Sequence, residues 1–185
     1  AQQCFGATGL IGSDGLFVDA MKIAKRSGHA GVDVLRLCQH PDLKALVVEF
    51  SWDEFIDQGL GLSCYSLIVC ADAPESEIFS KSELLQQLRY GLSSSGTILL
   101  PENLANLAPA QPSFWSKALL CCTSPWNECL KYLALNPNGI LQINEDKLSF
   151  YRGEIKESER TLPHTQANGL NLDAVVGHLL EQIGE

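Results

Sequence analysis

Long hydrophobic runs are missing from this sequence. Its longest mainly apolar stretches, 43–50 and 65–73, are far shorter than the roughly 20 apolar residues that a membrane-spanning helix needs. Hydrophobic residues make up 45% of the chain and charged residues 19%, which is ordinary for a globular protein and too apolar for a disordered one. A chain of 185 residues is therefore predicted to form a single domain over 1–185, with no membrane partner.

Clustered positive charge is also missing. The chain has 22 acidic and 13 basic residues, a net charge of −9, and no basic run longer than Lys25 and Arg26. Such a chain repels phosphate backbones and anionic lipids. We therefore expect no nucleic-acid partner and no binding to a membrane surface.

The cysteines show no metal-binding spacing. No CxxC pair occurs among the seven, so no metal site is predicted. Most of them lie in apolar runs, where they are expected to pack as small, reduced hydrophobic residues. This use of cysteine, with no signal-peptide pattern at the first residues, favours a reducing, cytoplasmic location. The cysteines are at 4, 38, 64, 70, 121, 122 and 129.

Apolar segments with strand-like and helix-like spacing alternate along the chain, which indicates an α/β fold with a mostly parallel sheet. We predict strands over 4–12 (running into a glycine turn), 32–37, 43–50, 67–71 and 97–100, and helices over 14–27, 52–58 and 80–92. We then predict a loop over 103–113, helices over 113–122 and 124–135, a hairpin over 140–151, a surface loop over 153–169 and a last helix over 172–183.

The segment 6–12 reads Gly-Ala-Thr-Gly-Leu-Ile-Gly, between a predicted strand and a predicted helix. In that context Gly6 would allow a tight turn, Gly9 would let the backbone approach a ligand, and Gly12 would let the helix pack close to the sheet. Thr8 lies within the same turn. Free amides at the helix start would then face an anion. A plain βα turn, with glycines needed only for its geometry, explains the segment equally well.

This segment resembles the nucleotide-binding turn of short-chain dehydrogenases/reductases. Arg36, at the end of the second predicted strand, matches the position where that family often places a basic residue for the NADP phosphate. The resemblance implies NADP as a cofactor. The family's catalytic Tyr-x-x-x-Lys pair is matched only by Lys117, with Ser113 in the place of the tyrosine, so the usual proton donor is missing.

Residues 65–102 resemble class I S-adenosylmethionine-dependent methyltransferases: a strand ending near Asp72, a helix, a Ser-Ser-Ser-Gly turn and a further strand. The hairpin at 140–151 fits the antiparallel strands that close that fold. The resemblance implies S-adenosylmethionine at the glycine segment, with Glu49 contacting the adenine. At the position of the acid that holds the cofactor ribose the chain has Arg36, which accepts no hydrogen bond.

A third resemblance concerns 144–155, which is similar to a strand motif after the non-catalytic ketoreductase-like subdomains of fatty-acid and polyketide synthases. Taken together, the resemblances imply a Rossmann-like three-layer sandwich with an antiparallel closing hairpin. They imply a methyltransferase-like domain with a degraded cofactor site, acting as a non-catalytic scaffold or partner-binding domain with a protein partner. Two alternatives stay open: an NADP-binding reductase-like protein and an active S-adenosylmethionine-dependent methyltransferase.

Overall fold

The computed structural model describes residues 6–72, 79–108, 111–135, 138–144 and 147–161. These fall into two compact units, a first unit up to Ser63 and a second unit from Cys64 onward. The first contains a four-stranded sheet and the second a six-stranded sheet, each mixing parallel and antiparallel pairs. The predicted α/β class is confirmed by these two mixed sheets. The assignment of both units to one domain stays a prediction.

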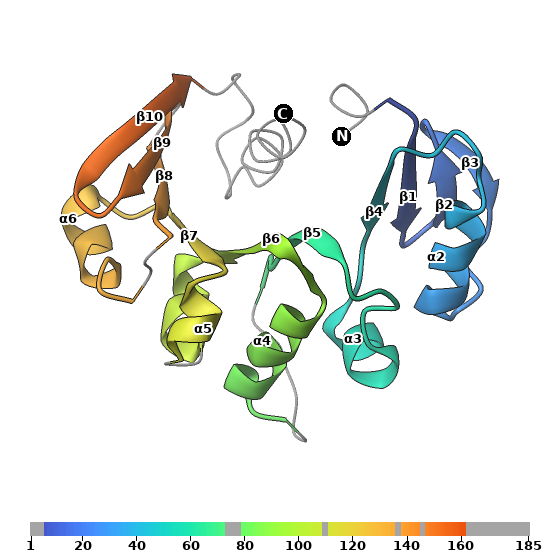
Figure 1. Ribbon diagram of the computed structural model, residues 1–185, viewed down its shortest axis with the longest axis horizontal. Helices are drawn as coiled ribbons and strands as arrows, with labels where there is room; N and C mark the ends of the chain where they lie inside the picture. Colours follow the sequence, from blue (N-terminus) through green and yellow to red (C-terminus); the bar gives the residue numbers. More distant parts are fainter. Residues whose placement is uncertain (1–5, 73–78, 109–110, 136–137, 145–146, 162–185) are drawn as a thin grey trace. The chain divides into compact units, whose positions relative to one another are not determined.

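The first unit is a four-stranded sheet covered on one face by helix α2 (Figure 1). Its strands, in the spatial order β3-β2-β1-β4, are β1 (Thr8–Gly12), β2 (Gly15–Val18), β3 (Met21–Ala24) and β4 (Ala45–Val48). β1 pairs antiparallel with β2 and parallel with β4. The parallel pairing is possible because the chain returns to β4 through helix α2 (Ala30–Cys38). The core holds Ile11, Leu16, Val18, Val34 and Leu37.

The helix predicted over 14–27 is wrong, because this segment forms β2 and β3. Apolar residues of so short a run fit a helical and a strand period equally well. The turn between the two strands decides the outcome, since Asp19 and Ala20 have φ angles of 49° and 68°. Two successive positive φ angles belong to the tight type I′ turns that join antiparallel strands.

The strand predicted over 32–37 is also wrong, because these residues lie in α2. The buried positions of this segment are Ala30, Asp33, Val34 and Leu37, a spacing of three and four that belongs to a helix face. Two other predictions for the first unit are confirmed. The strand at 43–50 appears as β4, and the helix at 52–58 appears as α3 (Trp52–Gln58), whose first turn is capped by the Ser51 side chain.

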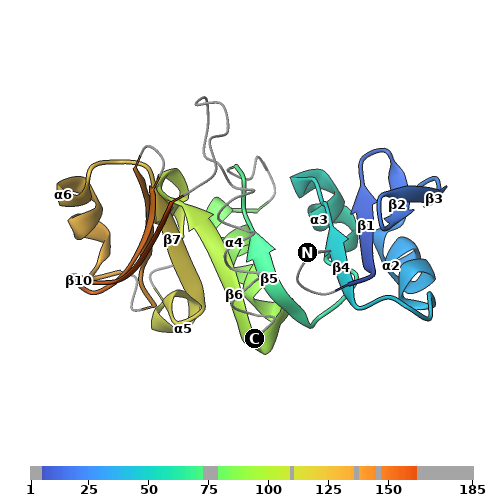
Figure 2. The same ribbon diagram turned by 90° about the horizontal axis from the view of Figure 1, so that it is seen from above.

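The second unit begins with four parallel strands in sequence order, followed by two antiparallel ones. They are β5 (Tyr65–Val69), β6 (Leu92–Pro101), β7 (Ala118–Cys122), β8 (Ile140–Asn144), β9 (Lys147–Arg152) and β10 (Ile155–Thr161). The helical segments between the parallel strands are α4 (Lys81–Tyr90), η1 (Glu102–Leu107), α5 (Pro112–Trp115), α6 (Trp126–Cys129) and η2 (Leu130–Tyr132). Figures 1 and 2 show α4 and α5 on the same face of β5–β7.

The central strands of this sheet are buried on both faces. Successive side chains of a strand point to opposite faces, and Ile98, Leu99 and Leu100 of β6 are all 0% exposed. Leu120, Cys121 and Cys122 of β7 are completely buried in the same way. Continuous apolar runs of this kind are typical of parallel strands covered on both sides.

Most predictions for the second unit are confirmed: the strands at 67–71 and 97–100, the helix at 80–92 and the hairpin at 140–151. The helix predicted over 113–122 is wrong beyond its first turn, since 118–122 form β7. The surface loop predicted over 153–169 is wrong where it is described, since 155–161 form β10. The loop at 103–113 begins with η1, and the helix at 124–135 is reduced to α6 and η2. The helix predicted over 172–183 lies outside the described residues.

Candidate functional site

The glycine segment forms a central strand and not a turn before a helix. Thr8, Gly9 and Gly12 lie in β1, whose residues pair with β2 on one side and β4 on the other. Gly6 precedes the strand with a φ of 82°. The expectation of a strand–turn–helix unit at 6–27 is therefore wrong. In a central strand the ladders on both sides use the backbone amides that a phosphate would need.

Gly9 is tightly packed against leucine side chains within the first unit. A Cβ at this position would lie 2.9 Å from Leu43 Cδ1, 3.2 Å from Leu46 Cδ1 and 3.3 Å from Leu37 Cδ1. The first of these distances is shorter than carbon atoms tolerate. The absence of a side chain at Gly9 therefore lets β1 approach the leucines beneath α2.

Carboxylates take the amide hydrogens at both ends of β1. Asp19 Oδ1 accepts a hydrogen bond from the Thr8 N–H at 2.9 Å, and Glu49 Oε2 accepts one from the Ser13 N–H at 3.0 Å. The same Glu49 oxygen lies 3.4 Å from the Cβ position of Gly12. Of the predicted site residues, the structure thus brings Gly12 and Glu49 together. The backbone N–H groups of Thr8 and Ser13 already have carboxylate partners.

Arg36 lies on α2 and not at the end of a strand. Its side chain is 53% exposed, and its Nη1 lies 3.8 Å from Oδ1 of the fully buried Asp33. Asp33 also accepts hydrogen bonds from the Ser27 N–H at 3.0 and 3.1 Å, and its Oδ2 lies 3.7 Å from Arg26 Nε. Asp33 therefore links the start of α2 to Arg26 and Ser27, and Arg36 lies next to the Asp33 carboxylate.

Asp72, the remaining predicted cofactor residue, follows β5 in the second unit. The other predicted positions, Gly6, Thr8, Gly9, Gly12, Arg36 and Glu49, all belong to the first unit. The predicted set is thus divided between two units, and inside the first unit only part of it gathers at the end of β1.

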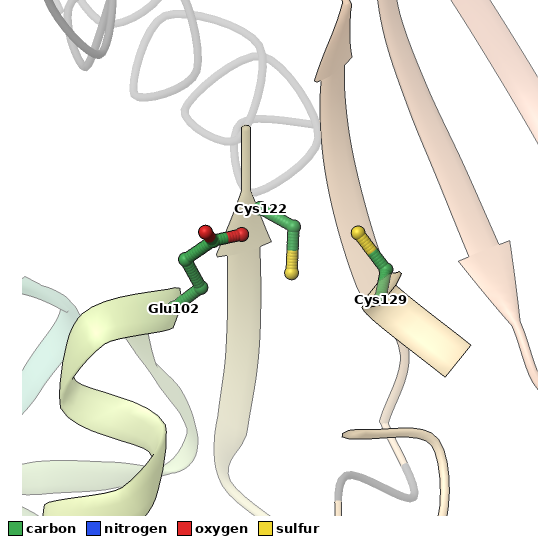
Figure 3. Close-up of side chains that lie close together, drawn as sticks. All are labelled: Glu102, Cys122 and Cys129. Carbon is green, nitrogen blue, oxygen red and sulfur yellow. The ribbon is translucent and has the colours of Figure 1, made fainter. Parts of the chain in front are cut away.

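A different cluster, made of Glu102, Cys122 and Cys129, lies in the second unit (Figure 3). Glu102 follows β6, Cys122 ends β7, and Cys129 ends α6. One carboxylate oxygen and the two Sγ atoms all lie within 4.8 Å of one another. Both cysteines are 0% exposed. Because β6 and β7 are parallel neighbours, their carboxyl ends bring Glu102 and Cys122 to the same sheet edge.

Hydrogen bonds hold Glu102 against the residues that follow β7. Glu102 Oε1 accepts a hydrogen bond from Ser124 Oγ at 2.5 Å, and Oε2 accepts the N–H groups of Thr123 and Ser124, each at 3.2 Å. The Ser124 carbonyl accepts the Cys129 thiol at 3.3 Å and the Gln142 Nε2 amide at 3.1 Å. This network links the carboxyl ends of β6 and β7 to α6 and to β8.

The thiols of this region are held in their neutral form. Burial raises the pKa of Cys122 well above its ordinary value, and the neighbouring Cys129 and Glu102 raise it further. Burial also raises the pKa of Cys129, and it raises that of Cys121 to about 12, with Glu102 adding to the effect. Without a bound cation, the cluster therefore consists of two packed, neutral thiols beside a carboxylate. Such a cluster contains no thiolate that could act as a nucleophile.

The sequence prediction missed this cluster because it looked for cysteines two residues apart. Here Cys122 and Cys129 lie seven positions apart, compared with three in a CxxC pair, and the third donor, Glu102, lies 20 positions before Cys122. The signal that would have found it is the sheet order. Had 118–122 been read as a strand next to 97–100, Glu102 and Cys122 would have been placed at one edge.

No family model matches the chain, and no curated protein matches it. Among the described residues, no helix has the length and apolar character needed to cross a membrane. The functional conclusion therefore depends on the chain's own residues.

Proposed function

We propose that the chain is a methyltransferase-like α/β protein with a degraded cofactor site, which acts as a non-catalytic, protein-binding scaffold within a larger assembly. The observation that carries the proposal is the position of β1 between β2 and β4. A nucleotide turn must present free backbone amides to phosphate or to a cofactor carboxylate. Thr8, Gly9 and Gly12 instead lie in strand ladders.

The charges around β1 support the same conclusion. Asp19 and Glu49 accept the N–H groups at the two ends of this segment. An anionic cofactor group would have to displace both carboxylates and then remain next to them, which like-charge repulsion opposes. Arg36, which the reductase resemblance assigns to the NADP phosphate, lies beside Asp33 on α2.

The second unit supports the Rossmann-like, three-layer part of the proposal. Its four parallel strands, β5 to β8, are followed by the antiparallel strand β9, and the methyltransferase resemblance implies such a reversed strand at the end of the sheet. Buried side chains on both faces of β6 and β7 are what a sheet between two covering layers requires.

An apolar row on the first unit supports the protein-binding part. Val47, Leu10 and Phe17 are paired across β4, β1 and β2, so their side chains share one face of the sheet. Their neighbours Ile11 and Leu16 belong to the core on the face toward α2. Leu10 is 39% exposed and Val47 41%. We propose this partly exposed row as the surface that a protein partner covers, since apolar surface is enriched at protein-interaction sites.

Calorimetric titration of the purified chain tests the cofactor part. S-adenosylmethionine, S-adenosylhomocysteine, NADPH and NADH are each titrated, and the proposal predicts no saturable binding at micromolar concentration. Micromolar binding of NADPH that is lost in Arg36→Ala would establish the reductase-like alternative. Binding of S-adenosylmethionine that is lost in Glu49→Gln, together with methyl transfer, would establish the active methyltransferase.

Crosslinking in extracts of the source cells, followed by mass spectrometry, tests the scaffold part. The wild type is compared with Leu10→Ser/Val47→Thr and with a matched control, Leu35→Ser, whose side chain is 62% exposed on α2. The proposal predicts a partner that the wild type and the control capture and that the double variant loses. Identical captured sets for all three proteins would refute the assignment of the apolar row.

A further inference from the structure

We infer that Glu102, Cys122 and Cys129 form a binding site for one zinc-class divalent cation. The three donor atoms lie within 4.8 Å of one another. Three different elements bring them together, since Glu102 opens η1, Cys122 ends β7 and Cys129 ends α6. Figure 3 shows the two thiols and the carboxylate in the same space between these elements.

The spacing of the donors is close to what the ion needs. In a tetrahedral zinc site, Zn–S bonds of about 2.3 Å place two ligand atoms roughly 3.8 Å apart, and carboxylate oxygens bind at about 2.0–2.2 Å. Donors that already lie within 4.8 Å need to close by about 1 Å at most, which small side-chain rotations supply. Cys122 and Cys129 are fully buried, so little water can reach their sulfur atoms and compete with them for an ion.

The surroundings of the donors are built as a supporting shell. Ser124 and Thr123 orient the Glu102 carboxylate through three hydrogen bonds. Gln142 fixes the Ser124 carbonyl next to Cys129. Residues that orient the ligands in this way are a regular part of protein metal sites, and they tune the affinity of those sites.

The donor set selects the class of cation. Two thiolates and one carboxylate suit a borderline-soft ion such as Zn²⁺, whereas Mg²⁺ and Ca²⁺ take oxygen ligands alone. The three deprotonated groups carry three negative charges, which a dication reduces to one. Three protein ligands leave a fourth coordination position for water or another ligand.

The same residues have a simpler explanation, in which Glu102 only caps the turn at 123–124 and the cysteines only fill the core. The two explanations differ in one respect. A capping role for Glu102 requires neither thiol, whereas metal binding requires all three side chains at once. This difference makes the cluster testable, and the test does not depend on the scaffold function proposed above.

The experiment uses the full chain with its thiols reduced, and Co²⁺ as a spectroscopic substitute for Zn²⁺. Three other cysteines are first replaced by serine so that they cannot bind the ion: Cys4, Cys38 and Cys64. Co²⁺ is titrated into this protein, and Zn²⁺ is then added to displace it. The expected result is one equivalent of Co²⁺ with a thiolate-to-cobalt absorption band, which one equivalent of Zn²⁺ removes.

The variants Cys122→Ser, Cys129→Ser and Glu102→Gln are compared with the control Cys70→Ser, which alters another buried thiol. Each of the three is expected to weaken Zn²⁺ binding by more than the roughly 10- to 100-fold effect of losing an outer-shell partner, and the control is expected to bind as before. Absence of Co²⁺ binding by the folded, reduced protein would overturn the inference. Zn²⁺ binding by all three variants as tight as that of the control would overturn it as well.

A measurement on the unsubstituted chain covers the case in which a thiol variant does not fold. X-ray absorption at the zinc edge counts the ligands directly in protein loaded with one equivalent. The inference predicts two sulfur ligands at about 2.3 Å together with oxygen ligands. A spectrum with no sulfur ligands, or with four, would overturn it.

Discussion

Replacing Gly9 by alanine separates a packing role for the glycine segment from a ligand-binding role. In the structure the new Cβ would lie 2.9 Å from Leu43 Cδ1 and within 3.3 Å of two further leucine methyl groups. Adding a methyl group to a packed core destabilises a protein by about 1–3 kcal/mol. Removing a glycine from a strand interior returns about 0.5–1 kcal/mol, so the net loss expected for Gly9→Ala is about 1 kcal/mol.

Gly31→Ala is the matched control for this change. Gly31 is the second residue of α2, and a Cβ there would meet only Gly61 Cα, at an ordinary 3.9 Å. Alanine is better than glycine in a helix interior by about 0.8–1.0 kcal/mol, and a smaller gain of the same sign is expected in this first turn. The same chemical change in the same unit is therefore expected to stabilise the protein at position 31 and to destabilise it at position 9.

Hydrogen exchange of peptides from 8–48 reports the stability of the first unit separately. A loss of about 1 kcal/mol makes opening of the structure roughly fivefold more frequent, so exchange in these peptides is expected to speed up in Gly9→Ala and to slow down in Gly31→Ala. Unchanged exchange in Gly9→Ala, with loss of binding to one of the four nucleotides, would refute the packing role.

Two further predictions concern the second unit. Ser80→Ala removes the cap of α4 and is expected to lower the free energy of unfolding by about 1 kcal/mol; a urea midpoint equal to that of the wild type would contradict it. Hydrogen bonds from Ser80 also lower the pKa of Glu83. The stability that these bonds to the ionised carboxylate add is present above the unfolded pKa of Glu83 and is lost as the pH falls through the lowered folded pKa. Burial, and then Asp72, raise the pKa of Cys70 to about 12, so mass spectrometry after alkylation at pH 8 is expected to find the exposed Cys38 and Cys64 modified and Cys70 unmodified. Equal modification of all three would show that Cys70 is accessible.

The second unit could largely be predicted from the sequence because its elements carry strong local signals. Ser80 and Glu83 form a capping box at the start of α4, and the buried second half of β6 and the whole of β7 are apolar runs. The Ser-Ser-Ser-Gly turn expected before 97–100 is wrong, because these residues already belong to β6. The prediction failed where a strand lacks that signal. β10 reads Ile-Lys-Glu-Ser-Glu-Arg-Thr, a polar sequence typical of an edge strand protected from aggregation.

The prediction for 14–27 in the first unit is wrong because the turn chemistry there is unusual. The turn between β2 and β3 is formed by Asp19 and Ala20, both with positive φ, whereas a type I′ turn is normally marked by Asn-Gly or Asp-Gly. Without that mark, the sequence predicts a helix over 14–27, and the strand–turn–helix interpretation of 6–12 follows from that prediction. One missed turn therefore changed the expected surroundings of Thr8, Gly9 and Gly12 from a ligand site to a packed sheet.

The Glu102 cluster was missed for a related reason. The continuous apolar run at 118–122 predicts a helix as well as a strand, because four of its five residues are buried and periodicity alone does not separate such a run from a helical segment. On a helix, Cys122 has no fixed relation to Glu102. Only the parallel pairing of β6 with β7 places the two side chains at one edge.

Residue-resolved amide hydrogen exchange over 8–12, measured with and without the four nucleotides, tests the central claim most directly. The claim is that β1 lies between two strands and offers no free amides. It predicts that the amides of Gly9 to Ile11, residues that pair with both neighbouring strands, exchange slowly in the free protein and do not change when S-adenosylmethionine, S-adenosylhomocysteine, NADPH or NADH is added. Fast exchange in the free protein that one of these nucleotides suppresses would contradict the claim and would restore 6–12 as a cofactor-binding turn.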